Sequence, residues 1–181
     1  MSTTARSWLA SAGDASTPGL LALRPDLGEL LDAMLDQLWR TLDPGLLEVC
    51  RVHVSATIGD RVGADLRTPG VDLDPELLAS LGSWWSSPHC DDRLRACLTY
   101  AEQFVLDVHG ITDDHAVAVA AHLTPAEQVA FTTALGLFDG LARMRKALVE
   151  PADVQGATVS IASDPLVRSG PSGPSGQEVA R

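Results

Sequence analysis

The stretch Asp43–Arg67, DPGLLEVCRVHVSATIGDRVGADLR, decides the fold class of this 181-residue chain. Its apolar residues recur at the three- and four-residue spacing of an α-helix, and no run of alternating β-branched residues interrupts them. Asp43 is placed to cap a helix, and Pro44 suits its first turn, where a backbone N–H has no helical partner anyway. The stretch therefore predicts a helix over residues 44–57, which Gly59 follows.

The same helical periodicity runs from Leu20 to about Glu150. Asp74 and Pro75 repeat the aspartate-proline start. TPAE at 124–127 is a capping box, in which the threonine and glutamate side chains satisfy exposed backbone amides. We expect an all-α domain of about six helices, with irregular chain around residues 59–73. The expected helices span residues 26–40, 44–57, 75–85, 91–108, 113–122 and 125–148.

Length and composition predict one domain with a flanking segment at each end. The chain is 45% apolar, which is enough for one substantial core. Residues 1–19 contain no apolar run long enough for a signal peptide or a membrane span, and we expect a flexible leader there. Residues 20–150 form the expected domain. Residues 151–181 are rich in Gly, Pro and Ser, which predicts a disordered tail.

The charge of the chain restricts its partners. Thirteen basic and 24 acidic residues give a formal net charge of −11, spread over the central segments. This balance argues against nucleic acid or a membrane surface as a partner. Three cysteines, an odd number without a repeated framework, favour a reduced, cytoplasmic protein over a disulfide scaffold. The sequence contains no cofactor motif, and we expect no bound metal.

Reactive side chains fall on two faces of the helix expected at 44–57. Glu48 and Arg51 share one face and can pair in the usual helical way. If that pair is buried, the arginine keeps Glu48 ionised. Without the partner, burial would raise the pKa of Glu48 and suit it to general acid or base chemistry.

The other face of that helix carries Cys50 and His53. Two sharper interpretations are a thiolate activated by the imidazole, or half of a metal site completed by His89 and Cys90. Neither is well supported, because spacing on one helix does not establish an oriented base, and zinc sites usually show tighter paired motifs. The pattern favours Cys50 as a small buried apolar residue.

Several motifs between residues 93 and 148 occur together in one known superfamily. They are an LTYAE element after a tryptophan pair, a threonine-aspartate turn, the helix start HLTPAEQ, and the closing GLFDGLARM. In order and spacing they resemble the carboxymuconolactone decarboxylase and AhpD-like alkylhydroperoxidase superfamily, and the likeness covers roughly residues 25–150. The resemblance implies an AhpD-like helical bundle and a homo-oligomer, to whose contacts Trp39, Trp84 and Trp85 could contribute.

In redox-active members of that superfamily the helix-ending glycine precedes a C-x-x-C pair, which works with a glutamate and a histidine as a peroxidase site. Glu48 matches the glutamate here. Asp60 and Gly63 stand at the two cysteine positions, and Arg67 stands at the histidine position. A carboxylate supplies neither the nucleophilic sulfur nor the resolving thiol of that chemistry. The resemblance therefore implies a member that lacks the redox dithiol.

The groups that remain favour proton transfer on a small anionic or carbonyl compound, as in a lyase or isomerase. The candidate catalytic residues are Glu48, Asp60 and Arg67, and the candidate substrate-binding residues are Arg51, His53 and Arg61. Two alternatives stay open: a non-catalytic ligand-binding or assembly protein, and an alkylhydroperoxidase-like antioxidant protein. A concave pocket containing Glu48, Asp60 and an arginine would favour the enzyme. A closed site in which Glu48 pairs with Arg51 would count against it.

Overall fold

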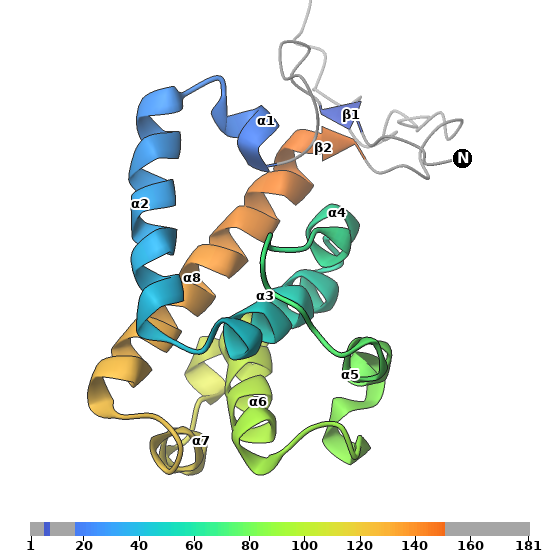
Figure 1. The fold of residues 1–181 in the computed structure, drawn as a ribbon, viewed down its shortest axis with the longest axis vertical. Coiled ribbons are helices and arrows are strands. Elements are labelled where there is room, and N and C mark those ends of the chain that lie inside the picture. The colour runs from blue at the N-terminus through green and yellow to red at the C-terminus, as the bar shows by residue number, and fades with distance from the viewer. Residues whose placement is uncertain (1–5, 8–16, 151–181) are drawn as a thin grey trace, which may run out of the picture.

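The computed structural model describes residues 6–7 and 17–150, which form a single all-α domain with one two-residue strand pair (Figure 1). The strands β1 (Arg6–Ser7) and β2 (Val149–Glu150) pair antiparallel. The α-helices are α1 (Thr17–Leu21), α2 (Pro25–Thr41), α3 (Pro44–Ile58), α4 (Arg61–Asp65), α5 (Pro75–Ser80), α6 (Asp92–Leu106), α7 (Asp113–Ala120) and α8 (Pro125–Leu148). Two 3₁₀ helices, η1 (Leu81–Ser86) and η2 (Val108–Gly110), complete the described elements.

Helix caps explain why the longer helices begin where the sequence predicts. Asp43 accepts hydrogen bonds from the amides of Gly45 and Leu46 at the start of α3, and Asp74 accepts one from Glu76 at the start of α5. Each such cap contributes about 1 kcal/mol. The expected capping box before α8 also forms, between Thr124 and Glu127. These local signals set element starts independently of the rest of the fold.

The structure differs most clearly from the expected helices in three places, besides the helix expected at 91–108, which ends at Leu106 before the separate η2. The helix expected at 75–85 is split into α5 and η1, with a non-helical residue at Ser83. The irregular region expected at 59–73 contains α4, which Asp60 caps by accepting a hydrogen bond from the amide of Gly63. The segment before residue 20 contains α1, which begins at Thr17. Short helices escape periodicity because they hold too few apolar residues to show a period.

The core lies around α3, whose residues from Leu46 to Ser55 are almost all buried. Figure 1 shows α3 near the centre of the domain, crossed by the long α8, with α2 on one side and α5 on the other. Helix α3 packs against α8, α6 and α4, and α2 packs against α8. Because α3 is covered all round, any polar group on it must find its partner inside the protein.

The predictions for the flanks fall largely outside the described residues. The expected tail at 151–181 lies entirely outside them, as do residues 1–5 and 8–16 of the expected leader. Residues 17–19 of that leader belong to α1. In the part of the chain that the structure describes, no helix has the length and apolar character needed to cross a membrane.

Candidate functional site

Glu48 is fully buried in α3 and forms a closed ion pair with Arg51, one turn further along the helix. The Nε and Nη2 atoms of Arg51 donate to the two carboxylate oxygens at 2.8 and 2.6 Å. The loop after α4 adds two more donors, because the amide and hydroxyl of Thr68 bind the same oxygens at 3.1 and 2.7 Å. Four hydrogen bonds therefore surround the carboxylate.

These contacts decide the protonation state of Glu48. Burial by itself raises the pKa of the carboxyl group, but the hydrogen bonds from Arg51 and Thr68 lower it by more, so that the pKa falls below its ordinary value. An ionised carboxylate with a lowered pKa and four donors is a poor proton acceptor at neutral pH and has no proton to give. The pair that helical spacing allows is therefore present in its buried form, in which the arginine keeps Glu48 ionised.

Asp60 forms a second buried ion pair, with Arg145 of α8. The Nε and Nη2 atoms of Arg145 donate to one oxygen of Asp60 at 2.8 and 2.6 Å, and both side chains are at most 6% exposed. The Nη1 atom of Arg145 donates to the hydroxyl of Thr17. This arginine therefore joins α1, α4 and α8 at one point.

Gly63 connects the two ion pairs through its own peptide groups. Its amide donates to Asp60 at 3.0 Å, and its carbonyl accepts from Arg51 at 2.8 Å. A Cβ atom at this position would lie 2.2 Å from Asp60, 2.4 Å from Arg145 and 2.7 Å from the Ser55 hydroxyl. Only a residue without a side chain fits here. Positions 60 and 63 are thus occupied by one member of a buried salt bridge and by the glycine that packs against that bridge.

A cavity of about 690 Å³ opens between α1, α2, α8 and the loop after α4. Most of its wall is apolar, formed by aliphatic and aromatic side chains that include Leu21, Leu31, Leu35, Trp39, Phe138 and Leu141. One side of the wall carries Arg51, Arg67, Thr68 and Arg145. An apolar hollow with a few polar groups on one side is the usual form of a small-molecule site.

The charged groups of this cavity differ in what they can offer a ligand. Arg51 and Arg145 are committed to Glu48 and Asp60. Arg67 is exposed and uses only its Nη1 atom, which donates to the carbonyls of Ala64 and Leu66. Its Nε and Nη2 atoms have no partner among the described residues. Arg67 is therefore the cationic group of the cavity that remains open to a ligand.

Acidic residues limit the charge that the cavity can accept. Glu29, Asp32 and Asp36 lie on α2 at the exposed rim, and Asp36 pairs with Arg40. Their negative charge disfavours a polyanion such as a phosphorylated compound. A single carboxylate or a neutral carbonyl group facing Arg67 and lying away from α2 avoids that repulsion.

The predicted site residues therefore separate into three places. Glu48 and Asp60 are buried and line no part of the cavity, whereas Arg51 and Arg67 line it. Arg61 lies exposed at the start of α4, outside the cavity lining. The partners Thr68 and Arg145 were missed by sequence reasoning, because they lie 20 and 85 residues from Glu48 and Asp60.

His53 points away from this cavity, toward α6 and η1. Its Nε2 atom lies 3.0 Å from the carboxylate of Glu102, which also accepts a hydrogen bond from Trp84 Nε1 at 3.2 Å. The Trp84 ring packs edge-on against the imidazole. Burial lowers the pKa of His53, and the bond to Glu102 offsets only part of that effect. A neutral His53 can donate its Nε2 proton to Glu102, which then accepts hydrogen bonds from both His53 and Trp84.

All three cysteines are free and buried, at Cys50, Cys90 and Cys97. Burial raises the pKa of each thiol, well above the ordinary value for Cys50 and to about 11 for Cys97. A protonated thiol without access to solvent is a weak nucleophile. This geometry agrees with the interpretation of Cys50 as a small apolar core residue.

We expect the native protein to be inert toward a thiol reagent. With 5,5′-dithiobis(2-nitrobenzoate) at neutral pH, the folded chain should release almost no thionitrobenzoate within minutes, because no thiolate is formed or exposed. The same sample in denaturant should react at all three cysteines. Rapid native labelling of one cysteine would contradict this assignment, and the matching Cys→Ser variant would identify it.

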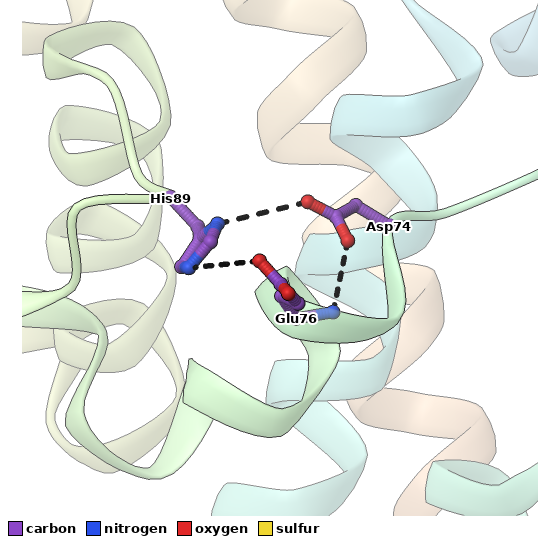
Figure 2. Close-up of side chains that lie close together, drawn as sticks. All are labelled: Asp74, Glu76 and His89. Carbon is purple, nitrogen blue, oxygen red and sulfur yellow. Dashed lines mark hydrogen bonds and ion pairs between the residues drawn. The ribbon is translucent and has the colours of Figure 1, made fainter.

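The four residues considered as a metal site from the sequence do not come together. His53 faces Glu102, while both ring nitrogens of His89 face carboxylates, Asp74 at 3.7 Å and Glu76 at 3.5 Å (Figure 2). Asp74, Glu76 and His89 are, among the residues that the structure describes, the group of His, Cys, Asp or Glu side chains close enough together to hold a metal ion.

Comparison with known proteins supports the fold. No protein-family model matches the sequence, and no curated protein shows significant similarity to it. The structure is similar to the crystal structure of a protein of unknown function from Agrobacterium tumefaciens, provisionally named the antioxidant defence protein AhpD. The TM-score is 0.62 at 20% sequence identity, over 71% of this chain and 91% of that chain. The chain therefore has the AhpD-like all-α fold, and this likeness assigns no activity to it.

Proposed function

We propose that this protein binds a small, mainly apolar compound with a single carboxylate or carbonyl group in the cavity beneath α1 and α2. The observation that carries the proposal is the cavity itself, which joins an apolar wall to the open guanidinium of Arg67. The apolar body of the ligand packs against side chains such as Trp39 and Phe138. Its oxygen atoms accept hydrogen bonds from Arg67 and lie near Thr68.

In this proposal binding takes place without acid-base chemistry at Glu48 or Asp60. Both carboxylates are buried behind their arginines, and the pKa of Glu48 is lowered. The groups expected to move protons thus lack contact with the cavity. This arrangement favours the non-catalytic ligand-binding alternative over a lyase or isomerase. The buried thiols likewise give an alkylhydroperoxidase activity no support.

Assembly as a homo-oligomer stays a prediction. Leu27, Leu30 and Met34 form an exposed apolar stripe along α2 and give it some support. Of the tryptophans expected at a subunit contact, Trp85 is 63% exposed, whereas Trp84 is buried.

The ligand proposal is tested with three probes that share one alkyl chain and differ in the head group. We expect decanoate to bind more tightly than decanol or decylamine in isothermal titration calorimetry. Arg67→Ala should weaken decanoate binding at least about tenfold, since a hydrogen bond to a charged group contributes about 1.5–3 kcal/mol. Binding of decanol should change little.

Arg61→Ala is the matched control, because Arg61 belongs to the same segment and does not line the cavity. It should leave decanoate affinity unchanged. Equal effects of the two arginine variants would refute the proposed head-group contact. Decylamine binding as tightly as decanoate would instead place the polar end of the ligand at the acidic rim of α2.

A further inference from the structure

We propose that Asp74, Glu76 and His89 form a binding site for a late first-row divalent metal ion such as Zn²⁺. The site departs from the expectation, drawn from the sequence, of no bound metal. It shares no residue with the arginine-lined cavity. Figure 1 shows α5, whose first turn carries Glu76, on the other side of α3 from α2. The inference is thus independent of the ligand-binding proposal.

The three side chains converge on one point from two segments of the chain. One ligand atom from each residue lies within 4.8 Å of the other two, and the three side chains point toward one another (Figure 2). His89 Nε2 lies 3.5 Å from Glu76, and Nδ1 lies 3.7 Å from Asp74. Both distances exceed an ordinary hydrogen bond. Because one ion binds only one ring nitrogen, one of these two distances separates neighbouring ligands, and it is close to the separation of about 3.3–3.6 Å expected around a tetrahedral ion with bonds of about 2.0–2.2 Å.

Partly buried hydrogen bonds fix the backbone that carries His89. The hydroxyl of Ser87 accepts from the His89 amide at 3.1 Å and donates to the Ser80 hydroxyl at 2.8 Å. Ser87 is 4% exposed, and its carbonyl also accepts from Arg95. The side chain of Asp74 is also fixed, because one of its oxygens accepts a hydrogen bond from the Glu76 amide. The backbone of His89 and the side chain of Asp74 are therefore fixed without an ion, which reduces the cost of binding.

The donor set selects the class of ion. One imidazole nitrogen and two carboxylate oxygens suit Zn²⁺ and its first-row neighbours, whereas Mg²⁺ and Ca²⁺ prefer oxygen ligands alone. Two carboxylates neutralise a divalent charge. The second ring nitrogen then faces the other carboxylate and can donate to it, as the outer nitrogen of a metal-bound histidine usually does.

Three protein ligands leave at least one coordination position open. An open hollow of about 560 Å³ lies beside the trio, lined by Glu76 and His89 together with Ser80, Ser83 and Ser86 among others. A water molecule or a small polar ligand can therefore reach the metal from this hollow. Such a site has the form of a reactive metal centre more than that of a closed structural one.

Isothermal titration calorimetry of the reduced full-length protein with ZnCl₂, in a buffer that does not chelate zinc, tests the site. We expect one Zn²⁺ per chain. His89→Ala and Glu76→Gln should each weaken binding about tenfold or more. Co²⁺ should give a visible absorption spectrum that both variants lose. All three side chains are at least one-third exposed, so the substitutions should leave the far-ultraviolet circular dichroism unchanged.

Two controls separate this site from its alternatives. His109→Ala removes an exposed histidine elsewhere and should have no effect on binding. Cys90→Ser removes the thiol next to His89 in the chain and should also have none. The proposal fails if His89→Ala binds like the parent, or if Cys90→Ser abolishes binding while Glu76→Gln does not. Competition by equimolar Mg²⁺ or Ca²⁺ would also overturn it, since it would indicate only diffuse attraction to acidic groups.

Discussion

Replacing Glu48 with glutamine should lower the free energy of unfolding by about 3–5 kcal/mol, although the two side chains have nearly the same shape. The carboxylate accepts hydrogen bonds from Arg51 and Thr68 in a site without solvent access. A glutamine amide leaves the largely buried guanidinium of Arg51 without its counter-charge and places an N–H₂ group opposite existing donors. Urea-induced unfolding followed by circular dichroism measures the loss.

Glu29→Gln provides the matched control, because Glu29 is exposed and forms no ion pair in the described part of the chain. It should change stability by no more than about 0.5 kcal/mol. The double variant Glu48→Gln/Arg51→Met should be less destabilised than the sum of its single variants, since removing both charges avoids an unpaired one. A Glu48→Gln protein as stable as the parent would show that the pair is not a stabilising contact.

The same pair predicts a direction for acid sensitivity. The pKa of Glu48 is lower in the folded protein than in the unfolded chain. Its contribution to stability is therefore complete above the unfolded pKa and is lost as the pH falls through the lower folded value. Unfolding measured between pH 7 and pH 3 should show this loss in the parent, and a smaller one in Glu48→Gln.

Gly63→Ala is expected to produce the second large effect, a loss of about 3 kcal/mol of stability. Alanine normally favours a helix over glycine, and Gly63 lies within α4 without a positive φ. Alanine is expected to destabilise the protein here, because the new Cβ collides with Asp60, Arg145 and Ser55. Asp60 and Arg145 form a buried ion pair. The added methyl group must separate that pair or move α4 away from α8.

Gly140→Ala is the control, and it is expected to raise stability instead of lowering it. Gly140 lies within α8, and a Cβ there meets nothing within 4 Å. The variant should be more stable than the parent by up to about 1 kcal/mol. Thermal unfolding of the two variants side by side separates the collision from the helix propensity. If Gly63→Ala were as stable as Gly140→Ala, the close packing around Gly63 would be wrong.

The helices were largely predictable because their signals are local. The aspartates at 43 and 74 cap the helices expected after them, and the capping box before α8 forms as its sequence predicts. The pairing of Glu48 with Arg51 was predictable for the same reason, since both lie one turn apart on α3. Each of these features depends on residues within four positions of one another.

The candidate site was less predictable because its contacts join distant parts of the chain. Helical spacing says which residues of one helix share a face, but not which other helix covers that face. Arg145 is 85 residues from Asp60. It lies on α8, whose other buried residues are all apolar, so the sequence pattern gives no sign of an ion pair there. The sequence suggests His89 as a ligand in a metal site with Cys50 and His53, yet the fold turns it toward Asp74 and Glu76. Such pairings become visible only once the packing is known.

The packing of the long α8 determines how cooperatively the domain unfolds. Because α8 packs against α2, α3, α4, α6 and α7, it forms part of nearly every layer of the core. The described core should therefore unfold as one cooperative unit without a stable half, and a truncation within α8 would remove the whole fold.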